Sequence, residues 1–414
     1  MCLGTKPDLI RQQNIWHVGY VPAKDITYFA RVDFRNDNRL FGIRDHDRFS
    51  HIYAIGKTGT GKSTLLETIV LQDIDRGKGA ALIDPHGDLA DAVAKNIPDR
   101  RKDDLLYLNA ADPSQPYGYN PLRRVRDDRI ALAASGLMEV FKRTWTDGWG
   151  VRMEHIMRNG IMALLERPHS TLPDLLRIFA DKEFRKEVVG QIRNETVRTF
   201  FQQEFERYSY AYRADGIAPI QNKVGAFLAD PLLNRILTKP QIDLHIREVM
   251  DRGKILLVNL AKGRIGDDSA SLLGGLLVTT IGLAAFSRAD LDPKDRHDFF
   301  ICVDEFQNFT TLSLANMLSE LRKYRIGFAM AHQYQHQLEP EIRHSVLGNC
   351  GTIISFRVGA EDAPYLAREF AGVFDAVDLQ NLPNHHIYLK LMIDGQPPRP
   401  FSAKTIRHRA ELIF

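Results

Sequence analysis

The chain has 414 residues, of which 44% are apolar and 26% charged, so it can bury a large core in two or three structural units. Its formal net charge is only +3, which excludes a protein that coats nucleic acid through bulk charge. Any basic binding surface must be concentrated on one face or in a channel. Three widely spaced cysteines, Cys2, Cys302 and Cys350, offer no disulfide framework or zinc-ligand spacing, as expected in a reducing cytosol.

Neither the N-terminus nor the most apolar run predicts a membrane segment. Residues 1–13 carry charges with no apolar stretch behind them, unlike a secretory signal. The run SLLGGLLVTTIGLAAF, residues 271–286, contains three glycines and is shorter than the roughly 20 apolar residues that span a bilayer. We therefore expect a core helix in a soluble, cytoplasmic protein with no membrane span of its own.

Short apolar runs alternate with helical patterns in two parts of the chain. The runs are HIYAI (51–55), GAALID (79–84), KILLVNL (254–260), FFICVDEF (299–306), IGFAMAH (326–332) and GTIISFR (351–357). This alternation is typical of βαβ units, in which helices cover both faces of a parallel sheet. The sequence therefore predicts an α/β domain with a mainly parallel sheet, built from residues 46–126 and 250–414.

The middle of the chain follows a different pattern. Residues 127–249 show apolar positions at helical spacing, as in RIALAASGLMEVF and LPDLLRIFA, and almost no strand signal. Since strand patterns resume at Lys254, this region is predicted to be an all-helical domain inserted into the α/β domain. In the N-terminal segment, residues 1–45, the stretches ITYFARV and RLFGI alternate and can pair as a hairpin at the sheet edge.

A phosphate-binding loop lies between the first apolar run and a helical pattern. The segment GKTGTGKS, residues 56–63, fits G-x-x-x-x-G-K-[ST], and a strand before it and a helix after it are the context that this motif requires. The glycines let main-chain N–H groups surround a phosphate at the positive end of the helix dipole. Lys62 is expected to reach the β- and γ-phosphates of ATP, and Ser63 to coordinate Mg²⁺. Nucleotide contacts are expected from Gly56, Thr58, Gly59, Thr60, Gly61, Lys62, Ser63 and Thr64.

Two acidic residues and a glutamine follow later strands. Asp304 ends the strand FFICV and is expected to hold Mg²⁺, and the adjacent Glu305 can polarise the attacking water. The alternative is a strand end with two solvated acids. The next strand ends in His332 and Gln333, and we favour Gln333 as the residue that senses the γ-phosphate. The catalytic set predicted from the sequence is thus that of an RecA-like P-loop ATPase.

Three other polar residues have an open interpretation. Asp84 can support the nucleotide site or cap the following helix, and the sequence favours neither. His332 and His336 raise the question of a metal site, but no third ligand lies at a suitable spacing.

These motifs together resemble a known superfamily. The segments GKTGTGKST, DPHGDL, VDEFQNF and AHQ resemble the FtsK/HerA superfamily of hexameric DNA translocases, and within it the TraG/TraD-type coupling proteins of conjugation and type IV secretion. The helical insert with TWTDGWGVRMEHIMRNGIMALL looks like the all-α domain of those proteins, and the resemblance covers residues 41–401. Coupling proteins usually begin with transmembrane helices and HerA helicases with a small β-barrel. Neither is expected here, which indicates a soluble relative from a mobile element or a defence or repair setting.

The resemblance has implications for assembly. The family forms rings with ATP between subunits, which implies a homohexamer and an arginine supplied by the neighbouring subunit. The match places Arg357 nearest to that position, with Arg325 and Arg368 as weaker candidates. The alternative for Arg357 is an ordinary strand-end arginine in a salt bridge.

Two segments are candidates for DNA contact in the pore of such a ring. Lys262 and Arg264 lie in the predicted loop KGRIGDD, which could equally be a surface turn. The segment RYSYAYR interleaves arginines with tyrosines, a composition suited to phosphates and stacked bases, although such aromatics also pack helices. Its candidate residues are Arg207, Tyr210 and Arg213.

Three functions are compatible with these motifs. The leading hypothesis is an ATP-driven DNA translocase that works with a relaxase, a nuclease or a secretion-system partner. The second is a motor of the same superfamily that moves or assembles proteins. The third is a regulatory nucleotide-binding module, against which Glu305 argues because a switch has little need for a carboxylate beside the γ-phosphate.

Overall fold

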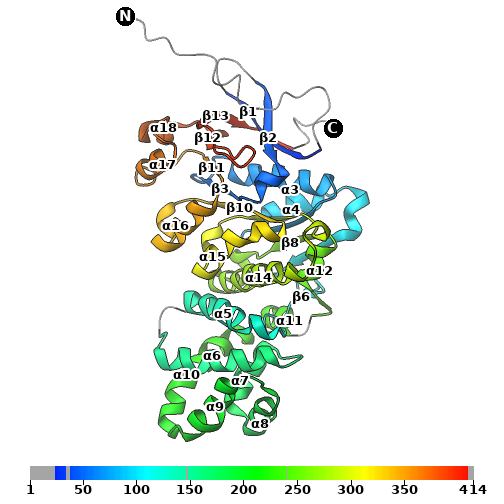
Figure 1. Ribbon diagram of the computed structural model, residues 1–414, viewed down its shortest axis with the longest axis vertical. Helices are drawn as coiled ribbons and strands as arrows, with labels where there is room; N and C mark the ends of the chain where they lie inside the picture. The colour runs from blue at the N-terminus through cyan, green and yellow to red at the C-terminus, as the bar shows by residue number, and fades with distance from the viewer. Residues whose placement is uncertain (1–23, 34–37, 146–147, 239, 409–414) are drawn as a thin grey trace, which may run out of the picture.

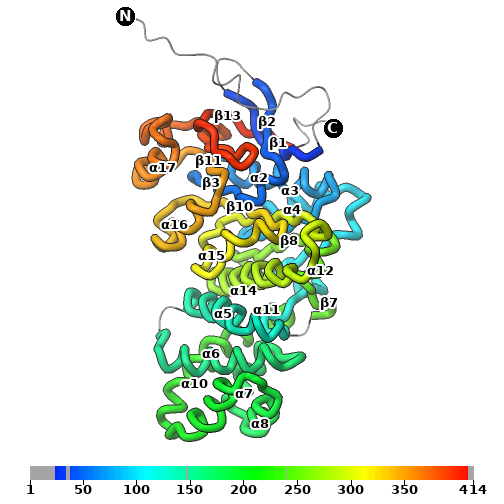
Figure 2. Tube along the Cα trace, in the orientation of Figure 1, coloured from blue at the N-terminus to red at the C-terminus, as the bar shows by residue number. Residues whose placement is uncertain are grey.

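The computed structural model describes residues 24–33, 38–145, 148–238 and 240–408. The interpretation of residues 1–13 and of Cys2 lies outside them. In the described part, an elongated molecule has a large sheet at one end and a group of helices at the other, and the chain passes from the sheet into the helices and back (Figures 1 and 2).

One large sheet organises the α/β part. In the described residues it has 11 strands in the order β2-β1-β13-β12-β11-β3-β10-β9-β4-β8-β5, and neighbouring strands from β11 to β5 run parallel. Each of the six predicted apolar runs contains one of these strands, so the α/β prediction is confirmed. They are β3 (Ile52–Ile55), β4 (Gly79–Asp84), β8 (Ile255–Asn259), β9 (Phe299–Val303), β10 (Ile326–His332) and β11 (Thr352–Ser355).

Antiparallel strands extend the sheet beyond β11. The strand β1 (Ile26–Val32) pairs with β2 (Leu40–Arg44) at the outer edge, and β1 also pairs with β13 (Phe401–Thr405). The strand β12 (His386–Lys390) then joins β13 to β11. The opposite edge is β5 (Leu105–Asn109), which pairs with β8. The sequence did not predict β5, β12 or β13.

Side chains that alternate along the strands bury two faces of the sheet. On one face Ile52 and Ala54 belong to a core with residues of α3 (Lys62–Asp75) and α4 (Asp88–Lys95). On the other face Tyr53 and Ile55 join a core with α14 (Asp267–Ser287) and α15 (Leu312–Leu321). Successive strand side chains point to opposite faces, so a sheet covered on both sides needs the nearly continuous apolar runs seen here. The remaining helices of this part are α2 (Asp45–Arg48), α13 (Lys262–Ile265), α16 (Pro340–Asn349), α17 (Ala363–Glu369) and α18 (Ala376–Asn381).

The apolar helix α14 lies inside the protein. Within the described residues it gives the one segment, Asp267–Asp290, that is long and apolar enough to cross a membrane, and 72% of its apolar window is buried. It packs against α5 (Ile130–Thr144) and α15. A helix that is apolar all round and buried in this way is typical of the core of a large domain.

Helices occupy the region between β5 and β8. After α5 they are α6 (Val151–Glu166), α7 (Leu172–Ala180), α8 (Lys182–Gln191), α9 (Glu195–Thr199), α10 (Tyr210–Ala229), α11 (Pro231–Thr238) and α12 (Ile246–Asp251). Two short strands, β6 (Tyr117–Gly118) and β7 (Ile242–Asp243), pair where the chain enters and leaves this region. We propose that residues 127–249 are an inserted domain, and we call them the helical insert.

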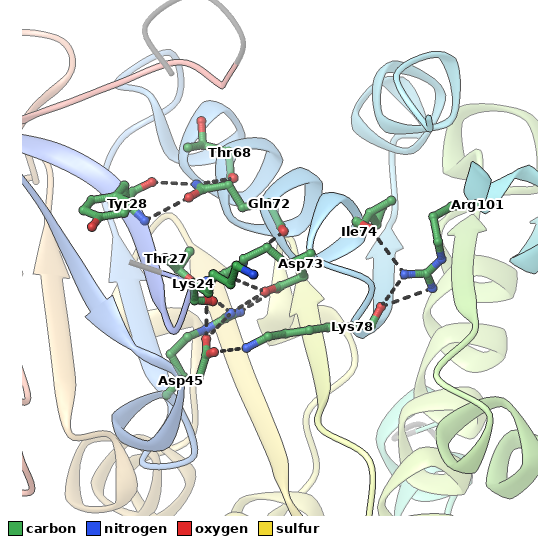
Figure 3. A network of polar contacts seen from close by, with 12 residues as sticks. Lys24, Thr27, Tyr28, Asp45, Thr68, Gln72, Asp73, Ile74, Lys78 and Arg101 are labelled. Atoms are coloured by element: carbon green, nitrogen blue, oxygen red, sulfur yellow. Dashed lines mark hydrogen bonds and ion pairs between the residues drawn. The ribbon is translucent and has the colours of Figure 1, made fainter. Parts of the chain in front are cut away.

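A buried ionic network anchors the C-terminal end of α3 (Figure 3). The two guanidinium nitrogens Nη1 and Nη2 of Arg48 donate to the two carboxylate oxygens of Asp73, at 2.5 and 2.7 Å. Arg48 also donates to the Thr27 hydroxyl at 2.9 Å, and its guanidinium lies 3.6 Å from the centre of the Phe300 ring. The network therefore ties α3 to the strands β1 and β9.

Candidate functional site

The ends of four neighbouring strands bring the predicted site residues together. The strands β3, β10, β9 and β4 are adjacent and parallel, so the segments that follow them meet at one edge of the sheet. The register pairs His332 with Ile55 and Met330 with Val303. Residues just beyond these pairs, including Gln333 and Asp304, are therefore placed beside the loop that follows β3.

The predicted phosphate loop has the backbone that its glycines allow. Gly59 and Gly61 have φ values of 76° and 121°, in a region that other residues rarely adopt. A Cβ atom on Gly61 would lie 2.7 Å from Nδ1 of His385, so this position also needs glycine for space. No side chain caps the first turn of α3, which leaves its N–H groups available to an anion.

Lys62 is buried at the start of α3 and turns back over the loop. Its ammonium group donates to the main-chain oxygens of Gly56 at 2.5 Å and Lys57 at 3.2 Å. Burial lowers the pKa of Lys62, and the nearby charges of Glu305 and Asp304 oppose that shift. The side chain is thus a cation held inside a loop of main-chain groups.

Asp304 and Ser63 form the pair predicted for Mg²⁺. The Ser63 hydroxyl donates to Oδ2 of Asp304 at 3.2 Å, across 241 residues of sequence. Asp304 is 5% exposed, and burial, followed by the charges of Glu305 and Asp84, raises its pKa to about 6. A hydroxyl and a carboxylate are oxygen ligands of the kind that bind Mg²⁺, and a bound cation would favour the charged form of Asp304.

Glu305 is held by an amide on each side. Its Oε1 accepts from Nε2 of Gln333 and its Oε2 from Nε2 of Gln307, both at 2.7 Å. The residue is 7% exposed and has a φ of 47°, the left-handed region that a glutamate rarely occupies. Strained backbone of this kind gathers at functional sites, where the surroundings impose it. Gln307 was not predicted from the sequence as a site residue, although its position two residues after Glu305 could have suggested it.

His332 takes no direct part in this cluster. It is fully buried, its ring nitrogen Nε2 hydrogen-bonds the Tyr53 hydroxyl, and burial lowers its pKa to about 3. His336 instead lies 3.6 Å from a carboxylate oxygen of Glu361. Among the described residues, the grouping of three potential metal ligands is His46, Asp47 and Asp394, which includes neither histidine.

Asp84 caps a helix at the same sheet edge. Its Oδ2 accepts from the N–H groups of Leu89 at 2.8 Å and Ala90 at 3.0 Å, in the first turn of α4. Of the two alternatives left open by the sequence, the capping role is the one seen here. The aspartate still acts on the site through its charge, because it contributes to the raised pKa of Asp304.

Comparison with known proteins agrees with this geometry. Residues 43–383 match the family described as the type IV secretion-system coupling protein DNA-binding domain. The chain belongs to this family. The resemblance found in the sequence is therefore confirmed for the coupling-protein type, while no curated protein sequence matches the chain.

Solved structures of coupling proteins have the same fold. The bacterial conjugative coupling protein TrwBΔN70 is 15% identical, with a TM-score of 0.63, over 92% of this chain and 89% of that chain. TrwB in complex with ADP and Mg²⁺ is 16% identical, with a TM-score of 0.64, over 95% and 97%. VirB4 of Thermoanaerobacter pseudethanolicus is 13% identical, with a TM-score of 0.61, over 94% and 99%. The chain thus has the P-loop NTPase fold of these proteins.

Arg357 lies against the phosphate loop of its own chain. Its main-chain oxygen accepts from the N–H of Lys57 at 2.8 Å. Its side chain donates to the main-chain oxygen of Leu382 at 3.0 Å and to Oδ1 of Asn384 at 2.9 Å. The guanidinium is therefore bound within the subunit in this structure.

The two weaker arginine candidates lie elsewhere. Arg325 immediately precedes β10, at the opposite edge of the sheet, and its Nε donates to Asp298 at 2.5 Å. Arg368 is exposed on α17. Neither contacts the phosphate loop of its own subunit.

The first candidate DNA segment differs from the predicted loop. Lys262 and Arg264 lie in the single-turn helix α13, because the N–H groups of Ile265 and Gly266 bond back to Ala261 and Lys262. Arg264 is exposed, and the ammonium group of Lys262 lies 3.9 Å from a carboxylate oxygen of Asp267. A basic pair is thus presented next to the start of α14, with acidic residues close by.

The second candidate segment is on the helical insert. Tyr210 is 90% exposed at the start of α10, and Arg207 is also exposed. Arg213 instead donates to the main-chain oxygens of Phe205 at 2.9 Å and Glu206 at 3.3 Å, so it holds the preceding turn. The structure separates the residues of this segment into exposed and packed positions.

Proposed function

We propose that this protein binds ATP with Mg²⁺, hydrolyses it, and uses the energy to translocate DNA as a ring of identical subunits. The observation that carries the proposal is the arrangement at the carboxyl edge of the sheet. There a phosphate loop, the Ser63–Asp304 pair and the carboxylate of Glu305 meet. A module that only binds nucleotide does not need the carboxylate of Glu305.

The residues present fit both ATP and Mg²⁺. The uncapped first turn of α3 and the ammonium of Lys62 provide donors for phosphate oxygens. Ser63 and Asp304 provide oxygen ligands for Mg²⁺, which, when bound, neutralises negative charge on the phosphates. The complexes of TrwB with ADP and Mg²⁺ and with an ATP analogue support this choice of ligands.

Hydrolysis follows from the position of Glu305. A carboxylate held by two amides keeps a fixed orientation, and at the edge of the phosphate loop it can accept a proton from the attacking water. Gln333 connects this carboxylate to the end of β10, beside the phosphate loop. We therefore assign Lys62, Asp304, Glu305 and Gln333 to catalysis.

DNA is the proposed cargo because the family is described as a DNA-binding domain. Phosphate contacts supply most of the affinity in such complexes, so we expect basic residues on the surface that meets DNA. Lys262 and Arg264, next to the sheet edge that carries the site, are our first candidates, and Arg207 and Tyr210 on the insert are the second.

The ring proposal assigns Arg357 to the site of a neighbouring subunit. To act there it has to leave Leu382 and Asn384, which hold it in the isolated subunit. An arginine supplied in this way is worth about 1,000-fold or more in turnover. We expect Arg357→Ala to abolish ATP hydrolysis and to keep nucleotide affinity, as measured by turnover and equilibrium binding. Normal turnover in this variant would exclude the assignment.

The experiment that tests the function is an ATPase assay without DNA, with single-stranded DNA and with double-stranded DNA, together with a mass measurement of the assembly. We expect DNA to stimulate turnover and the mass to be that of a ring, most simply a hexamer. Changing Lys262 and Arg264 together to alanine should weaken DNA binding and reduce its salt dependence.

The other outcomes point to the alternatives. Turnover that responds to a protein partner and ignores both forms of DNA would favour a motor for proteins. Slow turnover that responds to no cargo would favour a regulatory nucleotide-binding module. Either result would contradict the DNA translocase.

A further inference from the structure

The loop after β9 connects the hydrolytic carboxylate to the helical insert. Gln307 lies in the short turn Phe306–Asn308, is 5% exposed, and donates to Oε2 of Glu305 at 2.7 Å. Its own amide oxygen is buried and has no hydrogen-bond partner in the described part of the chain. Burying an amide oxygen in this way costs free energy, so other contacts must keep Gln307 in place.

One of those contacts comes from the helical insert. Nη2 of Arg143, in the last turn of α5, donates to the main-chain oxygen of Gln307. Burial lowers the pKa of Arg143, and the charge of Glu339 opposes that shift. An arginine side chain stays cationic in proteins. A charge-assisted hydrogen bond in such surroundings is stronger than one made in water.

The same helix also holds the far end of the loop. A carboxylate oxygen of Glu139, one turn before Arg143, accepts from the N–H of Ser313 at 2.7 Å, in the first turn of α15. Phe306, just before Gln307, and Phe309, between the two points, are buried at 1% and 2% exposure, and Phe309 contacts α14 at Gly274. The loop is therefore a packed connection whose position depends on α5.

The helix α5 faces both parts of the molecule. It packs on α14 and α15 of the α/β part and on α6 of the insert, and it lies between them in Figure 1. A shift of α5 would move the Gln307 main chain directly. It would act less directly on Lys62 and Ser63, because Lys62 bonds the main-chain oxygens of Gly56 and Lys57, and Ser63 meets the loop only at Asp304, directly after β9.

We propose that Arg143 and Gln307 are positioning residues for hydrolysis, through which the helical insert controls the orientation of the Glu305 carboxylate. The inference rests on the proposed function, in which Glu305 accepts the proton of the attacking water. Motion of the insert, for instance on contact with cargo, then changes the rate of turnover and leaves nucleotide binding unchanged.

The test compares Arg143→Ala with Lys142→Ala in the full chain. Lys142 is the neighbouring cation on α5, has a side chain that is 60% exposed, and lies 3.7 Å from a carboxylate oxygen of Glu154 within the insert. We expect Arg143→Ala to lower kcat at least about tenfold, because a misplacement of about 1 Å can cost 100-fold. The KM for ATP and the affinity for ADP should stay the same, and Lys142→Ala should behave as the wild type.

A double-mutant cycle separates positioning from general damage to the fold. Gln307→Ala should also lower kcat. Adding Arg143→Ala to it should have little further effect, because Arg143 acts on Glu305 through Gln307. Arg143→Lys should recover part of the rate, since an ammonium can still donate to the same carbonyl. Thermal unfolding of each variant shows whether the measured rates refer to folded protein.

Three results would overturn the inference. The first is an unchanged kcat in Arg143→Ala. The second is independent, multiplying losses in the double variant, and the third is a loss of ADP affinity as large as the loss of kcat. Failure of the proposed function itself looks different, because the wild type would then turn over ATP no faster than Lys62→Ala.

Discussion

The two ends of α3 each carry buried charges, but the charges are used differently. At the C-terminal end, both carboxylate oxygens of Asp73 are bound by Arg48, so the pair is closed within the protein. At the N-terminal end, the ammonium of Lys62 bonds only main-chain oxygens in the contacts described, and no described carboxylate forms an ion pair with it. The Arg48–Asp73 pair at the C-terminal end stabilises the fold, while the charge of Lys62 at the N-terminal end is available to a ligand.

This difference gives a physical criterion for telling a structural charge cluster from a functional one. Buried charges normally occur in pairs, because an unpaired charge loses its hydration without compensation. A buried lysine without a carboxylate partner, beside an aspartate whose pKa is raised to about 6, therefore indicates a site that a charged ligand completes. Changes at the two ends of α3 should accordingly give opposite phenotypes.

The largest effect is expected at the N-terminal end. Lys62→Ala removes the donor for the phosphates, and we expect ATP turnover to fall about 1,000-fold, the upper end of the range for loss of one charge-stabilising donor. The thermal unfolding midpoint without nucleotide should change little, because no ion pair is broken. A large loss of stability together with retained turnover would contradict this expectation, because Lys62 would then be a structural charge and not a functional one.

The next effect is expected at the C-terminal end. Asp73→Ala removes the bidentate partner of the buried Arg48 and leaves Asp45, 3.9 Å away, as its carboxylate neighbour. This should destabilise the protein by about 3 kcal/mol, while turnover per folded molecule stays near the wild-type value. The matched control is the double variant Arg48→Met and Asp73→Leu, in which apolar packing replaces both charges and stability should largely return. Denaturant unfolding measures both. Equal stability of Asp73→Ala and wild type would show that this network does not anchor α3.

The smallest effect is the pH dependence of stability that comes from His51, at the amino end of β3 and opposite to the phosphate loop. Burial lowers the pKa of His51 to about 4, and its ring bonds the main-chain oxygen of Leu318 at 2.8 Å and the N–H of Phe328 at 3.1 Å. The unfolded chain takes up the proton near pH 6.5. The stability from His51 is therefore complete above that pH and is lost as the pH falls toward 4, by about 2 kcal/mol at pH 5.

The measurement for this prediction is the unfolding midpoint between pH 7.5 and 5. In His51→Asn the midpoint should fall less over this range than in the wild type, while the control His344→Asn, at an exposed position, should follow the wild type. An identical pH dependence in wild type and His51→Asn would contradict the assignment.

Much of the α/β part could be predicted because each buried strand has a local signature. The runs that became β3, β4 and β9 are continuous and apolar, and the phosphate-loop motif fixes where β3 ends. The strand β5 was missed because LLYLN is only partly buried at the edge of the sheet. The strands β12 and β13 were missed because their pairing is antiparallel and depends on partners far away in the sequence.

For the candidate site, the sequence predicted most of the residues but not the hydrogen bonds between them. The motifs supplied Lys62, Asp304 and Glu305, since strand ends of a parallel sheet meet at one edge. Sequence could not show that Gln307 and Gln333 hold Glu305 from two sides, because that depends on a turn with a positive φ at a non-glycine residue. Contact between the insert and this turn, through Arg143, likewise exists only in three dimensions.

The measurement that tests the central claim most directly is single-turnover hydrolysis of bound ATP by Glu305→Gln. This change keeps the shape of the side chain and removes the charge that accepts the proton. We expect the variant to bind ATP and Mg²⁺ as the wild type does and to hydrolyse it at least about 100-fold more slowly, as general-base catalysis predicts. Hydrolysis within a few-fold of the wild-type rate would contradict the account, because the carboxylate at the sheet edge would then have no part in the reaction.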